Sequence, residues 1–171
     1  MWFKYPLIIV SLWLLSLAQH SFVSFVNIGV STPDLVFILF FLLIFFDKTG
    51  QGVFTAVIAG LFSDVFLPSY FGISIVSLFF LYFLGQLINY FFEKRRSDYL
   101  IFYFITIFSL SFILYNLLLY LFSIIFNFDF NLSWGNGVSL VYSLIIACLG
   151  FYFWIKFSKH KKEDDNQLKL L

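Results

Sequence analysis

Long apolar runs alternate with short polar breaks along the chain, and this pattern predicts an all-α membrane protein. The runs consist mostly of Phe, Leu and Ile, whereas charged and turn-forming residues gather in the breaks. A helix needs about 20 apolar residues to cross a bilayer, because each residue adds about 1.5 Å. The six predicted helices cover residues 5–25, 34–46, 50–66, 73–92, 99–126 and 138–157.

Two of these helices, the second and the third, are shorter than a full span. We therefore expect them to cross a thin region of membrane or to pack inside the bundle. The fifth helix is longer than a span and should tilt or bend.

Composition agrees with a lipid environment. Of the 171 residues, 62% are hydrophobic and only 11% are charged, whereas soluble domains have about 45–50% apolar and about 25% charged residues. We assign residues 1–157 to one six-helix transmembrane domain and 158–171 to a polar cytoplasmic tail that we expect to be disordered. The tail lysines would lie near the anionic inner leaflet, and docking of a cytoplasmic partner is the alternative role. A net charge of only +1 argues against a nucleic-acid-binding protein.

The basic residues predict the orientation. With six helices, all of them fall on one side of the membrane, and the positive-inside rule then places both termini in the cytoplasm. They are Lys4, Lys48, Lys94, Arg95, Arg96, Lys156, Lys159, Lys161, Lys162 and Lys169. A cleavable signal peptide is the alternative for the first helix, because Leu17-Ala18-Gln19 resembles a cleavage site.

Small residues form one face of the third predicted helix. At helical spacing, Gly52, Ala56 and Gly60 follow each other every four residues, and Asp64 continues the same step. Lipid provides no hydrophobic drive for helix association, so close backbone approach across small residues is a common way for such helices to pair. We expect this face to support close packing and, through it, assembly with a partner span.

Asp64 lies near the outer end of that helix, and three roles remain open for it. It can anchor the bundle by accepting hydrogen bonds, contribute to a partner-binding or ligand-binding pocket, or serve in proton relay or catalysis. Asp34 follows Thr32 and Pro33 at the start of the second helix. Thr32 is the predicted N-cap, Pro33 suits the first turn, and Asp34 complements the helix dipole. Alternatively, Asp34 and Asp64 share one outward-facing cavity.

The fourth predicted helix carries a polar stripe of Tyr82, Gln86 and Asn89, with Gly85 beside it. We expect these side chains to form interhelical hydrogen bonds. Gln19 and His20 lie near the outer end of the first helix, where interfacial hydration accounts for them.

Catalytic and metal-binding patterns are missing from the sequence. It contains no HExxH motif and no phosphate-binding glycine loop, and no Ser/His/Asp or Cys/His set falls at one membrane depth. Two separated carboxylates do not make a metal site. We therefore expect a protein that is not an enzyme and that has no cofactor.

Several of these residues resemble the conserved core of the MreD rod shape-determining family. Pro33-Asp34-Leu35 opens the second helix, and Gly60-Leu61-Phe62-Ser63-Asp64 ends the third, followed at family spacing by Pro68 and Gly72. The similarity covers about residues 33–92, and the basic cluster after the fourth helix agrees with it. The chain departs at Ala56, where the family usually has glycine, and at Ile73-Ser74, where it often has a polar pair.

This resemblance implies a non-enzymatic scaffold subunit of the cell-elongation machinery in the bacterial cytoplasmic membrane. Its expected partner is the single-span protein MreC, with MreB, RodA and a class B penicillin-binding protein in the wider complex. The family is similar in fold to the substrate-binding subunits of energy-coupling-factor transporters, which implies a vitamin-capture subunit as the alternative. The first helix lacks the AxxxA-type pair typical of those subunits, having Ser11, Ser16 and Ala18 instead. Pocket or partner-site candidates are Pro33, Asp34, Gly52, Ala56, Gly60, Asp64, Gly72, Gln86 and Asn89.

Overall fold

The computed structural model describes residues 4–22, 32–46, 51–66, 71–92, 100–128, 130 and 133–168. Over these residues the protein is all-α, as predicted. The six helices are α1 (Lys4–Phe22), α2 (Leu35–Phe46), α3 (Gly52–Phe66), α4 (Ile73–Phe92), α5 (Leu100–Phe126) and α6 (Trp134–Leu168).

The last helix differs most from its prediction. It begins at Trp134 rather than Val138. The Asn136 amide donates to the Ser133 carbonyl oxygen at 3.0 Å, a bond that belongs to the first turn of the helix. It also continues to Leu168, so the disorder expected for the tail is wrong for residues 158–168. Lys, Glu and Gln, which occur in this segment, are good helix formers. Polarity in this tail therefore does not interrupt the helix.

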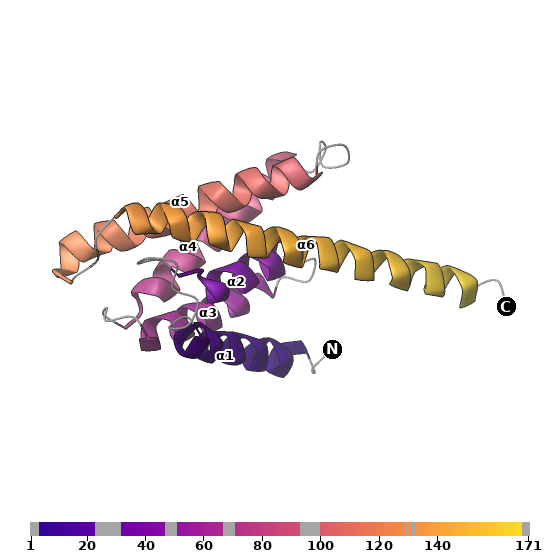
Figure 1. The fold of residues 1–171 in the computed structure, drawn as a ribbon, viewed down its shortest axis with the longest axis horizontal. Coiled ribbons are helices and arrows are strands. Elements are labelled where there is room, and N and C mark those ends of the chain that lie inside the picture. The colour runs from indigo at the N-terminus through magenta and orange to yellow at the C-terminus, as the bar shows by residue number, and fades with distance from the viewer. Residues whose placement is uncertain are drawn as a thin grey trace.

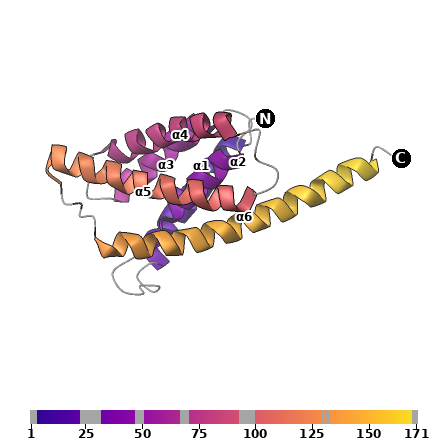
Figure 2. The same ribbon diagram turned by 90° about the horizontal axis from the view of Figure 1, so that it is seen from above.

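Successive helices run back and forth (Figure 1). The same arrangement seen from above shows α4 and α5 side by side, with α6 extending beyond the other helices toward the C-terminus (Figure 2). In both views the start of α1 and the end of α6 lie on the same side of the molecule.

Two of the described helices are long and apolar enough to cross a membrane. They are Ile101–Phe126, with 26 residues and a mean hydropathy of 2.0, and Trp134–Lys156, with 23 residues and 2.1. The α2 helix has only 12 residues, which corresponds to about 18 Å. Seven of its residues are buried and the other five are partly buried, so α2 is enclosed by its neighbours.

An aromatic core joins α2 to α5 and α6. The Phe37 ring of α2 lies 5.7, 5.3 and 5.2 Å from the rings of Phe108, Phe112 and Tyr115 on α5. Toward the other end, Phe104 of α5 stacks on Phe151 of α6 with ring centres 4.3 Å apart. Aromatic pairs in these arrangements add to the packing energy, and a short helix held in this way needs no lipid contact of its own.

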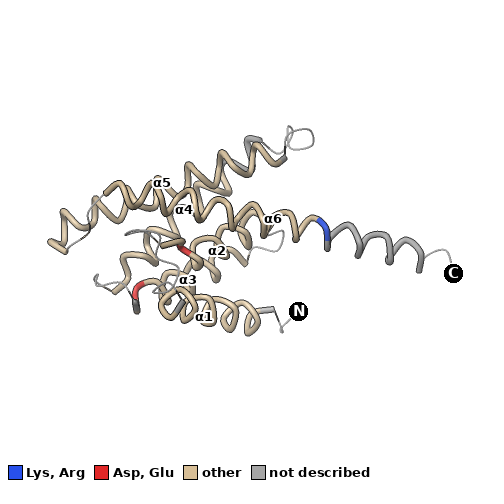
Figure 3. Tube along the Cα trace, in the orientation of Figure 1, with Lys and Arg blue, Asp and Glu red and all other residues tan. Residues whose placement is uncertain are grey.

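Charged side chains are rare within the described part of the chain. Figure 3 shows the acidic positions in the half of the helical body away from the two chain ends, and the basic position on α6 toward the C-terminus. Lys48, Lys94, Arg95 and Arg96, on which the orientation prediction depends, lie outside the described residues, as does Pro68.

The aromatic core predicts which phenylalanines matter for stability. Phe37→Ala should lower the free energy of unfolding by about 3–5 kcal/mol, because it empties a site that is 1% exposed and surrounded by rings. Phe102→Ala on α5 is the matched control, since Phe102 is 66% exposed. Thermal unfolding of the purified variants in one detergent measures both, and equal loss for the two variants would contradict the packing described here.

Candidate functional site

The small-residue face of α3 packs against α4 within the same chain. A Cβ atom added at Gly60 would lie 2.6 Å from the backbone nitrogen of Ile75 and still closer to its Cα. One added at Gly52 would collide with the Tyr82 ring. Ala56 and Ala59 are fully buried between these positions. The close packing is present as predicted, and because α4 occupies this face, a partner span would have to bind elsewhere.

Asp64 connects the end of α3 to the start of α4. Its carboxylate accepts hydrogen bonds from the backbone amides of Gly72, at 2.7 Å, and Ser74, at 2.9 Å. The first amides of a helix have no partner inside the helix, so a buried helix start must obtain acceptors from elsewhere. Asp64 is 4% exposed. Of the three open roles, the structure gives it that of an anchor accepting backbone hydrogen bonds.

Gly72 permits this connection. Its φ angle is +106°, a conformation that residues with a Cβ rarely adopt. Its carbonyl oxygen accepts the Val76 amide at 3.0 Å, in the first turn of α4. Gly60, Asp64 and Gly72 therefore form one structural unit, in which the glycines allow the close approach and the turn, and the carboxylate caps the helix.

Asp34 is itself the N-cap of α2, which corrects the prediction that Thr32 has this role. The Asp34 carboxylate accepts the Phe37 amide at 2.9 Å, the usual bond from a capping side chain to the third residue of a helix. Thr32 contributes its carbonyl oxygen, which accepts the Ser139 hydroxyl of α6. Pro33 precedes the cap and is half-buried. The helix starts one residue later than the sequence suggested because the capping residue lies outside the helix.

Side chains from two other helices complete the start of α2. The Gln19 side-chain oxygen accepts the amides of Leu35, at 3.0 Å, and Val36, at 3.3 Å. The Ser143 hydroxyl of α6, fully buried, accepts the Asp34 amide at 3.0 Å. Gln19 therefore has a structural role that the interpretation as a hydrated residue missed.

A polar cavity of about 240 Å³ lies beside this cap. Side chains of α1, α3 and α5 line it together with the start of α2. The lining residues are Ser16, Gln19, His20, Thr32, Asp34, Val36, Phe62, Ser63, Tyr115, Asn116, Leu119 and Phe130. Asp34 is the one carboxylate among them, and Asp64 does not belong to the lining.

Tyr115 lies near both acidic residues. It is 3% exposed, lines the cavity, and is close enough to both Asp34 and Asp64 to interact with them electrostatically. Ser63 and Ser74 lie close to its hydroxyl group. Asp34 and Tyr115 line the cavity and Asp64 does not, so the two carboxylates do not share this cavity.

Three cavity residues had a signal in the sequence that the predictions did not use. Ser16, Tyr115 and Asn116 interrupt apolar runs, and polar residues inside such runs are candidates for functional sites. The polar stripe of α4 is less informative, because Tyr82 packs on Gly52, Gln86 is half-buried, and the side chain of Asn89 lies outside the described residues.

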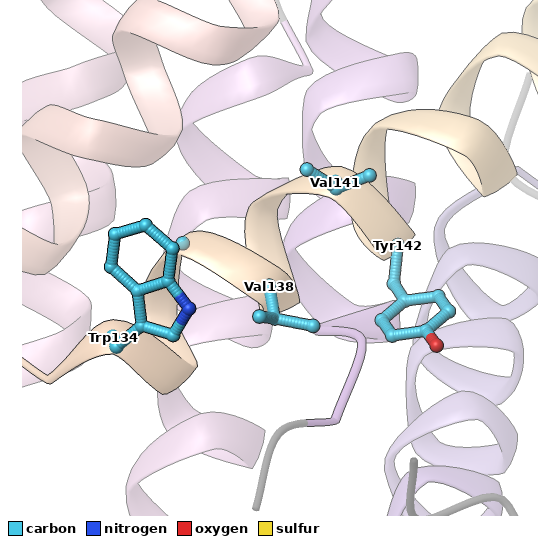
Figure 4. Close-up of a pocket in the computed structure, with 5 residues that line it drawn as sticks. Trp134, Val138, Val141 and Tyr142 are labelled. Carbon is cyan, nitrogen blue, oxygen red and sulfur yellow. The ribbon is translucent and has the colours of Figure 1, made fainter. Parts of the chain in front are cut away.

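A second hollow lies on the first turns of α6 and has a different character. It has a volume of about 530 Å³ and is lined by Trp134, Gly137, Val138, Val141 and Tyr142. Figure 4 shows Trp134, Val138 and Tyr142 following one another along the helix. The lining has no charged group, so the cavity at Asp34 is the better candidate for binding a polar ligand. In the described part of the chain, no three His, Cys, Asp or Glu residues come together as metal ligands.

No protein-family profile, no characterised protein and no solved structure matches this chain. The resemblance to the MreD family stays a prediction from the motif residues.

The contact between α3 and α4 predicts a different response at two glycines. Gly60→Ala should destabilise the protein by about 1–3 kcal/mol, because its new methyl group meets the backbone of Ile75. Gly85→Ala on α4 is the control, since its Cβ would lie 4.0 Å from the Ile44 side chain, an ordinary contact. Unfolding midpoints in detergent measure both changes, and a fully stable Gly60→Ala protein would disprove the close approach.

The cap of α4 gives a second prediction. Asp64→Ala should cost about 1–2 kcal/mol, because the Gly72 and Ser74 amides lose their acceptor. Asp64→Asn keeps one acceptor oxygen and should fall between this variant and the natural protein. The comparison is again made by unfolding in detergent, and an Asp64→Ala protein of unchanged stability would contradict the capping role.

A substitution at Gly72 tests the backbone conformation that leads into the cap of α4. Gly72→Ala should cost about 1 kcal/mol from the positive φ angle alone, because its Cβ would meet no atom within 4 Å. Gly137→Ala is the matched control, since a Cβ there also meets nothing within 4 Å but the residue lies inside α6. The control should be neutral or stabilising. An equal effect of the two substitutions would contradict the explanation by the positive φ angle.

Proposed function

We propose that this chain is a non-enzymatic scaffold subunit of a bacterial cell-elongation complex, similar to the MreD family. The observation that carries the proposal is that the residues of the MreD-like motif share one structural role, which is to fix helix ends and helix contacts. Asp34 caps α2, while Gly60, Asp64 and Gly72 form the junction of α3 and α4. A motif built from helix caps and close contacts is what a membrane scaffold requires, because its function depends on shape.

The engagement of both carboxylates supports the non-enzymatic part of the proposal. Asp64 accepts two backbone amides, and Asp34 accepts the Phe37 amide. Protonation of Asp64 would weaken both of the bonds that it accepts, so Asp64 is a poor proton carrier.

We also propose that all six helices cross the cytoplasmic membrane, with both termini in the cytoplasm. The helices alternate in direction, and the two chain ends lie on one side (Figures 1 and 2). The ten basic residues would then share that side. The acidic positions coloured in Figure 3 lie toward the opposite end of the helical body, which would then be the outer side.

A partner span would bind one of the exposed apolar faces. On α5, for example, Leu110, Ile113 and Ile124 are 55, 54 and 58% exposed. Such faces must meet either lipid or another helix. Under this proposal the partner is an MreC-type single-span protein, with MreB, RodA and a class B penicillin-binding protein in the wider complex.

The polar cavity favours a second candidate function, capture of a small molecule for an energy-coupling-factor transporter. A substrate-binding subunit needs a cavity lined by polar groups, and the cavity at Asp34 supports this candidate. Its volume of about 240 Å³ is below the roughly 300–1,000 Å³ of most drug-sized ligand sites, which favours the scaffold.

Purification of the tagged chain from its own membranes in mild detergent distinguishes the two functions. The scaffold predicts that an MreC-type single-span protein co-purifies and that depletion of the chain turns rod-shaped cells round. The transporter predicts co-purifying ATPase and coupling subunits, with unchanged cell shape. Retention of rod shape on depletion would overturn the scaffold proposal.

A further inference from the structure

The cavity beside the α2 cap has an uneven charge balance. Its lining contains the carboxylate of Asp34 and the imidazole of His20, and no lysine or arginine. The Phe37 amide donates to one carboxylate oxygen, Oδ1, and the Gln19 side chain and the Val36 amide also lie close enough to donate to the carboxylate. Carboxylates within apolar surroundings are usually paired with a positive group, because an isolated charge is costly there.

Ser16 gives a second, independent indication of a ligand. It is 2% exposed and lines the cavity, and the structure records no hydrogen-bond partner for it among the described residues. Ser11, one helical turn and one residue earlier on α1, donates instead to the Leu7 carbonyl oxygen at 2.8 Å. The Ser16 oxygen is not among the fully buried, unpaired atoms of the described residues, which are Ser74 Oγ and Asn136 Nδ2, so it is accessible from the cavity and can bond to a polar guest.

The remaining lining residues define the chemistry of that guest. Phe62, Tyr115 and Phe130 contribute aromatic rings, and Asn116 donates its side-chain amide to the Phe112 carbonyl oxygen, which leaves its own oxygen as an acceptor. Carboxylate, amide and hydroxyl oxygens together with aromatic faces attract organic cations. A volume of about 240 Å³ admits a group of a few heavy atoms.

We propose that this cavity binds a guanidinium or alkylammonium group, held by Asp34 and Ser16 between aromatic rings. The cation is carried either by a free small molecule or by an arginine or lysine side chain of a partner protein. The proposal goes beyond the scaffold function and holds equally for the transporter alternative, since it depends only on the cavity.

Binding of methylguanidinium to the purified full chain tests the proposal, with methylurea as the neutral isostere. Thermal unfolding should shift upward in a saturable manner with methylguanidinium, at concentrations below those that denature, and should not shift with methylurea. Asn is as good an N-cap as Asp, so Asp34→Asn should keep its unfolding midpoint without ligand and bind methylguanidinium more than about tenfold more weakly.

Two serine variants keep the test decisive if Asp34→Asn does not fold. Ser16→Val fills part of the cavity without touching a helix cap and should also weaken binding, whereas Ser11→Val lies outside the lining and should not. Absence of a saturable shift, an equal shift with methylurea, or unchanged binding by Asp34→Asn and Ser16→Val would overturn the proposal and leave a water-filled cavity.

A photocrosslinking residue in place of the exposed His20, which lines the cavity, identifies the source of the cation. Crosslinking to a protein in native membranes, lost in Asp34→Asn, assigns the cation to a partner side chain. Methylguanidinium binding without such a crosslink assigns it to a free small molecule. These two results both support cation binding, and either can occur with or without co-purification of an MreC-type protein.

Discussion

The structure depends on supplying hydrogen-bond acceptors to helix starts that lie inside an apolar body. A helix start exposes amides that have no partner within the helix, and neither lipid nor a core of phenylalanine can accept their hydrogen bonds. At α2 the acceptors come from Asp34, Gln19 and Ser143, and at α4 they come from Asp64. These side chains belong to different helices, so each cap also fixes the position of one helix relative to another.

Two kinds of packing are combined around these caps. On one side, α3 and α4 approach so closely that Gly60 has no room for a side chain beside Ile75. On the other, α2 is separated from α5 by full aromatic rings, with Phe37 in contact with three of them. Small residues allow backbones to approach, and rings fill the wider space. The polar cavity lies where these regions meet, beside the cap of α2.

This arrangement connects the proposed functions to a physical feature. A scaffold requires a fixed shape with apolar faces left for lipid and partners, and the caps and close contacts provide the fixed shape. The cavity adds a place where charge is unbalanced, with the Asp34 carboxylate and the unpaired Ser16 hydroxyl in one small space. A partner side chain that enters this space would couple recognition to the cap of α2, because Asp34 takes part in both.

The sequence by itself determined the elements of this protein. The helix ranges followed from the alternation of apolar runs and breaks, and α4 begins and ends at the predicted residues. The spacing of Gly52, Ala56, Gly60 and Asp64 also predicted a closely packed face, because the periodicity of a helix is local. The helical tail was missed, because polarity was given more weight than the helix propensity of Lys, Glu and Gln.

Only the tertiary structure decided which residues of different helices are in contact. It showed that α4 covers the small face, that Asp64 reaches the Gly72 and Ser74 amides, and that Gln19 crosses to the start of α2. Nor could the sequence show that Tyr115 lies near both Asp34 and Asp64. These contacts join residues on separate helices, and their formation depends on how the helices pack in three dimensions, which local patterns do not specify.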